Sequence, residues 1–369
     1  MTVPIRTRDR IEGLDALRGL AALAVLLHHD THFYDVLYPG RAPLPFNLDV
    51  GHFGVELFFI ISGFVIFMTL ERKNSLYRFA VSRVARLYPA FLAAAAFTAT
   101  MLYLHPLPPP LGAPSAGAIL ANLTMAPLLL NHTGIDLPYW TLTYELVFYV
   151  SIAAIFCLGL LGRIELVALL WLALDLVVLV SGRHLYHRLE ILLLIRYANF
   201  FFIGIALYRI RTGQATRLTY WVLALCVGIT LFGGGETAFY TPGPEYFLVT
   251  LGFTALVWLA TRYPVRAAAI APLLFLGRIS YPLYLIHAAL GFEIIRIVQQ
   301  AGGSSLLGLA LAVAGALAVA TLINVFVETP GKRLINRALS PRRGFIPAVE
   351  EVVAVAGGGL PPEAAPPQP

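Results

Sequence analysis

The chain is dominated by long apolar runs that recur along nearly its whole length. Of its 369 residues, 59% are hydrophobic and 12% are charged, and the mean hydropathy is +0.78. A soluble domain is roughly half apolar and a quarter charged. A helix of about 20 apolar residues spans the hydrocarbon core of a bilayer with its backbone hydrogen bonds satisfied. The pattern therefore predicts an all-α, polytopic membrane helix bundle.

We expect about ten transmembrane helices. The predicted spans are residues 12–33, 50–70, 82–104, 138–160, 164–181, 190–208, 219–235, 245–261, 270–296 and 305–327. Residues 105–138 hold shorter apolar stretches flanked by prolines, which favours a re-entrant or interfacial segment. We expect a transmembrane domain over residues 1–340. Residues 341–369 are rich in Pro, Gly and Ala, and this composition predicts a disordered cytoplasmic tail.

The basic residues lie mostly in alternate loops. On one side are 19 of the 26 Lys and Arg residues, whereas the opposite loops hold only Arg41, Arg183, Arg188 and Arg296. By the positive-inside rule both termini are cytoplasmic, in a bacterial plasma (inner) membrane. The net charge of +6 then reflects the orientation of the chain in the membrane. We expect contacts with membrane lipids and no nucleic-acid partner.

A few ionisable residues remain inside the predicted spans, where such groups are rare and usually face a bundle interior or a wet cavity. Arg18 and His29 are eleven residues apart on the first span. On an α-helix this separation is about 16 Å along the axis and about 20° around it, so the two side chains share a face. His28 points about 80° away from Arg18 by the same geometry.

The depth of these residues separates two groups. Arg18, Arg83, Arg86 and Arg278 lie near the cytoplasmic boundary. His29, Glu56, Glu145 and His287 lie in the outer half of their spans. This arrangement suggests a polyanion that enters from the cytoplasm and acid–base chemistry nearer the outside.

Structural explanations also exist for these residues. Arg83 and Arg86 could be anchors that reach the lipid headgroups. Glu145 and His287 could form one polar contact between helices. His28 and His32, in the segment HHDTH, have the spacing of a metal-binding pair, but no further ligand cluster with zinc spacing follows. We therefore expect no metal.

Six segments occur in an order that resembles the acyltransferase 3 family of bacterial integral-membrane O-acyltransferases. They are LDALRGLAALAVLLHH, GVELFFIISGFVIF, SRVARLYP, YWTLTYELVFY, LGRISYPLYLIH and VETPGKR, and the resemblance extends from about residue 11 to residue 335. The resemblance implies a ten-helix membrane domain and an acyl-CoA donor taken from the cytoplasm. It also implies an enzyme that transfers acyl groups other than aminoacyl groups, often acetyl, to carbohydrates and some secondary metabolites.

The family's motifs coincide with residues already singled out. Its first-helix pattern, a basic residue and a histidine separated by ten positions, is matched by Arg18 and His29. Its R-x-x-R motif is matched by Arg83 and Arg86, and the acidic residue before FF-x-x-SGF is Glu56. The tryptophan-led motif supplies Trp140 and Glu145, and the motif LGRISYPLYLIH supplies Ser280, Tyr281 and His287. Tyr144 is one of the aromatic residues near these positions that could stack on a sugar ring.

We therefore expect a membrane O-acyltransferase that moves an acyl group from acyl-CoA to a hydroxyl of a carbohydrate or glycosylated metabolite. The assigned roles are catalysis by His29, Glu56, Glu145 and His287, donor binding by Arg18, Arg83, Arg86 and Arg278, and acceptor binding by Trp140, Tyr144, Ser280 and Tyr281. Whether His29 acts as a general base or carries the acyl group stays open, as does the carboxylate that partners it. The alternative is a proton-coupled transporter or flippase for a sugar or lipid-linked substrate, with the same ionisable residues as a proton relay.

Overall fold

The chain folds into helices and turns. The computed structural model describes residues 11–39, 44, 46–109, 111–181, 186–232, 243–263 and 270–339, and these residues form no strand. The all-α prediction is confirmed. The predicted tail, residues 341–369, lies outside the described residues.

The α-helices are α1 (Glu12–His28), α2 (Tyr34–Leu37), α3 (Gly54–Lys73), α4 (Leu76–Leu104), α5 (Ala116–Leu123), α6 (Trp140–Cys157), α7 (Ile164–Ser181), α8 (His187–Leu192), α9 (Ala198–Thr212), α10 (Arg217–Gly228), α11 (Pro244–Arg262), α12 (Ala271–Gln300), α13 (Ser305–Ile323) and α14 (Thr329–Leu339). Two π-helical turns, η1 (His29–Phe33) and η8 (Asn324–Glu328), continue α1 and α13. Five 3₁₀ turns complete the described elements: η2 (Asp49–Phe53), η3 (Pro127–Leu130), η4 (Leu137–Tyr139), η5 (Leu161–Arg163) and η6 (Ile229–Leu231).

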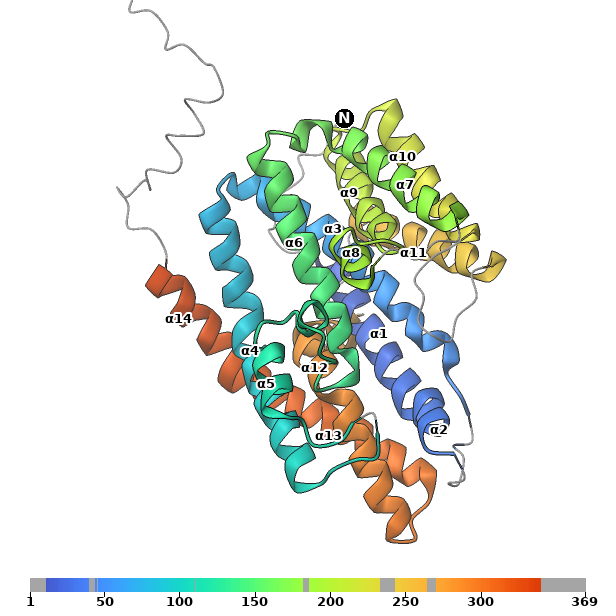
Figure 1. Cartoon of the computed structure of the whole chain (residues 1–369), viewed down its shortest axis with the longest axis vertical. Coiled ribbons are helices and arrows are strands. Elements are labelled where there is room, and N and C mark those ends of the chain that lie inside the picture. Colours follow the sequence, from blue (N-terminus) through green and yellow to red (C-terminus); the bar gives the residue numbers. More distant parts are fainter. Residues whose placement is uncertain are drawn as a thin grey trace, which may run out of the picture.

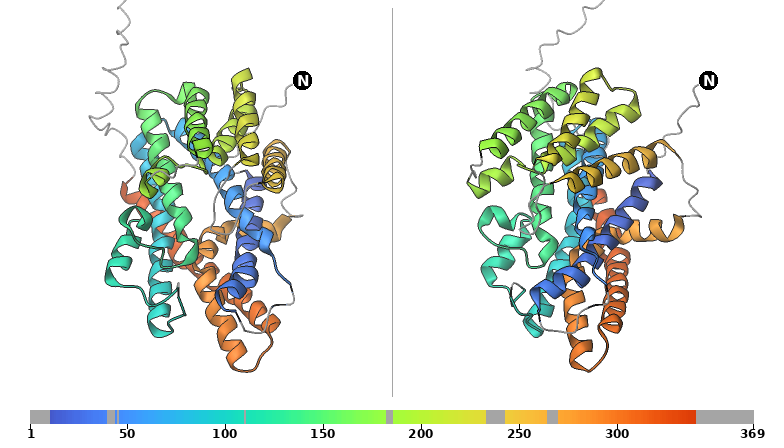
Figure 2. Two further views of the ribbon diagram at one scale, coloured as in Figure 1. Left: turned by 45° about the vertical axis from the view of Figure 1, so that its right-hand side comes forward. Right: turned by 90° about the vertical axis from the view of Figure 1, so that its right-hand side faces the viewer.

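The helices form one bundle with two distinct ends (Figure 1). Helices α7, α9, α10 and α11 gather at one end, and the hairpin of α12 and α13 forms the other, as the turned views also show (Figure 2). Helix α1 packs against α12 and α3, and α3 packs against α9. The helices that carry the predicted site residues therefore lie in the centre of the bundle.

The crossing of α1 and α12 is unusually close. A Cβ atom at Gly19 would come within 2.6 Å of the backbone nitrogen of Gly277, and one at Gly277 would collide with the carbonyl of Asp15. Membrane helices use small residues in this way because packing, rather than water exclusion, drives their association. The crossing places Arg18 of α1 beside the first half of α12.

Six helical segments are long and apolar enough to cross a membrane within the described parts of the chain. They are Asp49–Lys73, Leu76–Leu104, Leu137–Cys157, Pro244–Arg262, Ala271–Gln300 and Ser305–Leu339. Helices α1, α7, α9 and α10 lie in the other predicted spans. The chain is a membrane protein, whereas the count of about ten spans stays a prediction.

The predicted span 190–208 is wrong as a single helix. Helix α8 ends at Leu192, and α9 begins at Ala198. Between them Leu194 and Arg196 have positive φ angles of 51° and 73°, which L residues rarely adopt and which interrupt a helix. The Arg196 backbone N–H donates to Asp175 Oδ1 at 2.8 Å, so the break is held by a polar contact to α7.

Candidate active site

Three cavities follow one another through the bundle. The inner and middle cavities share Arg18, Val65 and Arg86 as lining residues. The middle and outer cavities share Val55 and Tyr284. The shared walls make them neighbours, so a long ligand could extend from one to the next.

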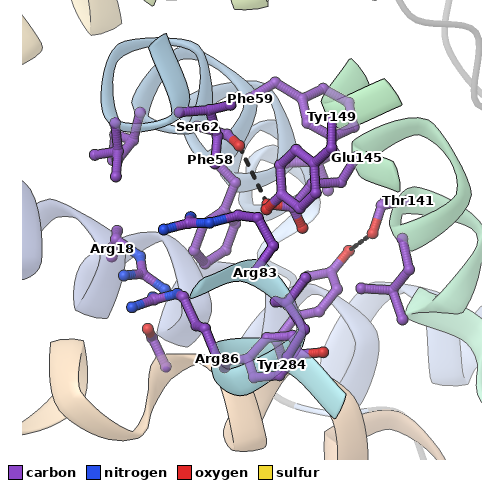
Figure 3. Close-up of a pocket in the computed structure, with 18 residues that line it drawn as sticks. Arg18, Phe58, Phe59, Ser62, Arg83, Arg86, Thr141, Glu145, Tyr149 and Tyr284 are labelled. Atoms are coloured by element: carbon purple, nitrogen blue, oxygen red, sulfur yellow. Dashed lines mark hydrogen bonds between the residues drawn. The ribbon is translucent and has the colours of Figure 1, made fainter. Parts of the chain in front are cut away.

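The middle cavity is built around three arginines. Arg18 comes from α1, and Arg83 and Arg86 come from the first half of α4. Their guanidinium groups point to the same side of the cavity (Figure 3). The Arg83 Nε is buried and has no hydrogen-bond partner among the described residues. Guanidinium groups are planar, permanently charged donors, and such a cluster suits a phosphate or another polyanion.

Glu145 of α6 lies in the same middle cavity. Its Oε1 accepts hydrogen bonds from Ser62 at 3.1 Å and from the hydroxyl of Tyr149, one turn further along α6. Figure 3 shows this carboxylate close to Arg83. The contacts favour a role for Glu145 in compensating the arginine charges. Glu145 does not line the outer cavity, which contains His29.

His29, the first residue of η1, lines the outer cavity, and the buried His287 of α12 packs against its ring. His287 Nδ1 lies 3.2 Å and 3.0 Å from the carbonyls of Leu283 and Tyr284, and it therefore carries the ring hydrogen. His287 Nε2 then has a lone pair, which accepts from His29 Nδ1 at 3.2 Å. His29 Nδ1 also lies 2.9 Å from the carbonyl of Val25. This assignment from the hydrogen-bond network leaves Nε2 of His29 as an available base.

Glu56 lies in the same cavity as His29, and it is 6% exposed. Its Oε1 accepts from the hydroxyl of Tyr246 at 2.7 Å, and its Oε2 has no hydrogen-bond partner among the described residues. Because an unpaired buried carboxylate oxygen is costly, this atom is suited to accept a hydrogen bond from a ligand. Of the two predicted carboxylates, the outer cavity thus contains Glu56 and not Glu145.

The predicted acceptor-binding residues divide between the two cavities. Trp140 and Tyr144 line the outer cavity, with ring centroids 5.8 Å apart. Ser280 and Tyr281 line the middle cavity, and the Ser280 hydroxyl donates to the carbonyl of Gly277 at 3.0 Å. The four side chains therefore do not surround one ligand position.

Tyr284 forms the wall between the middle and outer cavities. Its hydroxyl is 2.8 Å from Thr141 Oγ1, and its ring contacts those of Phe58 and His287. This hydrogen bond joins α12 to α6 (Figure 3). A ligand that reached from the arginines to His29 would pass Tyr284.

Two expectations about position need adjustment. Arg278 is exposed and lines the inner cavity, away from the cavity that holds Arg83. His28 was expected on a different face from His29, but both line the outer cavity, which curves around the end of α1. The inner cavity is also lined by Lys332 and Arg333. These are the last two residues of the VETPGKR segment, and the sequence analysis gave them no role.

Asp136 fixes the end of α6 against α12. Its Oδ1 accepts backbone hydrogen bonds from Leu137 at 2.8 Å and from Ala289 at 3.1 Å. Burial raises the pKa of the Asp136 carboxyl to about 7, and the two backbone donors act in the opposite direction. Sequence patterns alone gave this residue no role, because its partner on α12 is distant in the chain.

The fold and these cavities define an integral-membrane protein with a buried, polar site that runs through its helix bundle. A family model described as an acyltransferase domain, Acyl_transf_3, matches residues 11–325. The chain therefore belongs to the acyltransferase 3 family, and it is a membrane enzyme that transfers acyl groups.

One curated relative has a related sequence over part of its length. Acyltransferase MdmB of Streptomyces mycarofaciens is 28% identical over 148 residues, and this match covers 38% of each chain. The chain thus aligns with well under two thirds of that relative. No solved structure matches this chain.

Proposed function

We propose that this protein transfers an acyl group, acetyl in the first instance, from cytoplasmic acyl-CoA to a hydroxyl of a carbohydrate or glycosylated metabolite. The main support is the row of adjoining cavities, with arginines in the inner and middle cavities and His29, backed by His287, in the outer one. Family membership supplies the acyl-transfer chemistry.

The donor would bind with its phosphates at the arginines. Arg18, Arg83, Arg86 and Arg278 lie along the inner and middle cavities, where guanidinium groups can hold phosphate oxygens in bidentate pairs. The pantetheine arm would extend past Tyr284, so that the thioester reaches the outer cavity. The acyl chain then lies near His29.

In the reaction, His29 Nε2 removes the proton of the acceptor hydroxyl while the hydroxyl oxygen of the acceptor attacks the thioester carbonyl. The C–S bond breaks, and the coenzyme A thiolate leaves and takes up the proton that His29 had removed, which restores the neutral imidazole. The imidazolium that forms on His29 is stabilised by the Val25 carbonyl and by His287 Nε2, which makes His287 a positioning residue. Glu56 Oε2 would hold the acceptor, and Trp140 and Tyr144 would stack on a sugar ring.

A covalent route is the second version of this mechanism. His29 would first take the acyl group from the donor and then pass it to the acceptor. Incubation with labelled acyl-CoA in the absence of acceptor, followed by mass spectrometry of the α1 peptide, separates the two routes. Acyl-His29 is expected only in the covalent route.

The orientation follows from the distribution of basic residues. We propose a bacterial plasma (inner) membrane location with both termini in the cytoplasm, a transmembrane domain over residues 1–340 and a cytoplasmic tail over residues 341–369. The inner cavity then faces the cytoplasm, where acyl-CoA is found.

The test is transfer of radiolabelled acetyl from acetyl-CoA to a carbohydrate fraction by membranes that contain the protein. Membranes with the wild-type protein should show transfer, and membranes without it should not. Uptake of a sugar into proteoliposomes that is driven by a proton gradient and needs no acyl-CoA would instead favour the transporter.

A further inference from the structure

A second group of side chains in the outer cavity has no part in the proposed acyl transfer. His28 and His32 come from the end of α1 and from η1, and Asp49 and His52 come from η2. The ligand atoms of His28, Asp49 and His52 all lie within 4.8 Å of one another. On sequence grounds only His28 and His32 could be recognised as a pair, and this led to the expectation of no metal.

The backbone brings these two segments together. A Cβ atom at Gly51 would collide with the carbonyl of Ala24 and come within 2.9 Å of the His28 Cβ, so only glycine allows η2 to lie this close to α1. His28, Asp49 and His52 thus face one another although they are separated in the chain.

The distances are close to those between ligands of one metal ion. Asp49 Oδ1 lies 3.8 Å from His28 Nδ1 and 3.4 Å from His32 Nε2, and the ligand atoms of His28, Asp49 and His52 lie within 4.8 Å of one another. Ligands at 2.0–2.1 Å from a tetrahedral zinc ion are about 3.3 Å apart. Side-chain movements of up to about 1.5 Å would therefore bring these ligand atoms to a shared ion.

The hydrogen bonds leave room for ligation at His28. His32 Nδ1 lies 2.9 Å from the Asn47 side-chain amide nitrogen, and ligation through His32 Nε2 requires this amide to turn its oxygen toward Nδ1. His28 is 7% exposed, and its Nδ1 has no hydrogen-bond partner among the described residues although it points toward the Asp49 carboxylate. His52 Nδ1 donates to the carbonyl of Asp49 at 2.5 Å, which fixes the ring and leaves the lone pair on Nε2. A bond of this kind orients most metal-bound histidines through their second nitrogen.

We propose that His28, His32, Asp49 and His52 form a binding site for one divalent cation of the zinc class. Imidazole nitrogen and carboxylate oxygen are ligands that Zn²⁺ accepts in tetrahedral sites. The site is separate from the His29–His287 pair, and it does not depend on the proposed acyl transfer. A bound ion would tie η2 to the end of α1 at the mouth of the outer cavity.

The experiment measures zinc binding by the purified full-length protein. The protein carries an affinity tag without histidines, is treated with EDTA and is titrated with Zn²⁺, and the retained metal is counted by mass spectrometry. The wild-type protein should hold one equivalent. Co²⁺ should give the intense visible absorption bands of a tetrahedral site.

Four variants test the assignment. Loss of even an indirect partner weakens metal binding about 10- to 100-fold, so Asp49→Asn and His28→Gln should raise the dissociation constant by at least about 100-fold. The control is His105→Ala, because His105 is exposed and has a carboxylate, Glu293, at 3.7 Å without further imidazoles. Its binding should equal that of the wild type.

His32→Ala keeps the test decisive if a buried variant fails to fold, since the His32 side chain is 25% exposed. Elution profile and melting temperature of each metal-free variant report folding. The proposal is overturned if the wild-type protein retains no zinc, or if the Asp49→Asn and His32→Ala variants bind it as tightly as His105→Ala does.

Discussion

The middle and outer cavities differ in the chemistry of the side chains that line them. The middle cavity contains three guanidinium groups and one carboxylate. The outer cavity contains imidazoles together with the aromatic rings of Trp140 and Tyr144. Fixed charges suit the binding of an anion, and imidazoles suit the movement of a proton. In the proposed function, donor binding and proton transfer would thus take place in different cavities.

Substitution of His29 should have the largest effect on this division. His29→Ala removes the base, and acyl transfer should fall by about 10²- to 10⁴-fold because general-base catalysis contributes that factor. The measurement is acetyl transfer per unit of membrane-inserted protein. His105→Ala is the matched control and should keep wild-type activity. Transfer by His29→Ala at the wild-type rate would remove His29 from catalysis.

A bulky side chain between the middle and outer cavities should have the next largest effect on acyl transfer. Val55 lines both the middle and outer cavities, and Val55→Trp would fill the passage beside Tyr284. We expect kcat to fall by about 10- to 100-fold, since misplaced reactants lose that much. Binding of coenzyme A itself should change little. Unchanged turnover in a folded Val55→Trp protein would show that the donor reaches His29 by another route.

Arginine variants should affect binding of the donor rather than turnover. Arg83→Ala and Arg86→Ala each remove a charge-assisted hydrogen bond, and the KM for acyl-CoA should rise by about 10-fold, or about 1.4 kcal/mol. Arg78→Ala is a suitable control because Arg78 is exposed near the start of α4 and does not line these cavities. An unchanged KM would contradict a role for Arg83 and Arg86 in binding the donor.

The smallest expected effect is on the pH dependence of stability, through Asp136, which connects the start of α6 to α12. Burial raises the pKa of Asp136 to about 7, so folding favours its neutral form. This contribution to stability is complete below the unfolded pKa near 3.8 and is lost as pH rises toward about 7. The melting temperature of wild type should therefore fall between pH 5 and pH 8 by at least about 2 °C more than that of Asp136→Asn. Parallel curves would contradict the assignment.

Sequence patterns predicted the helical bundle because apolar length and loop charge act locally. Arg18, Glu56 and His287 were recognised as costly residues inside apolar runs, and each of them lines a cavity or contacts a residue that does. Helical geometry placed Arg18 and His29 on one face of the first span, and the two residues line neighbouring parts of the row, Arg18 the inner and middle cavities and His29 the outer cavity.

Contacts between distant segments could not be predicted in this way. The pairing of His29 with His287, the separation of Glu56 from Glu145 and the approach of η2 to His28 all depend on how helices cross. The interruption near Arg196 depends likewise on an acceptor from α7, Asp175. Periodicity describes one helix at a time and has no information about such contacts.

The glycine contact between α1 and α12 has a consequence for the spacing of the two imidazoles. Gly19 and Gly277 allow the backbones of α1 and α12 to come into contact, and the angle between the helices at this contact sets their separation further along. His29 and His287 are each ten residues further along, about 15 Å away, so a small tilt at the contact becomes a large error at the rings. A methyl group at Gly19 or Gly277 would push the two helices apart and change the angle between them. The distance between the His29 and His287 rings thus depends on two positions that carry no side chain.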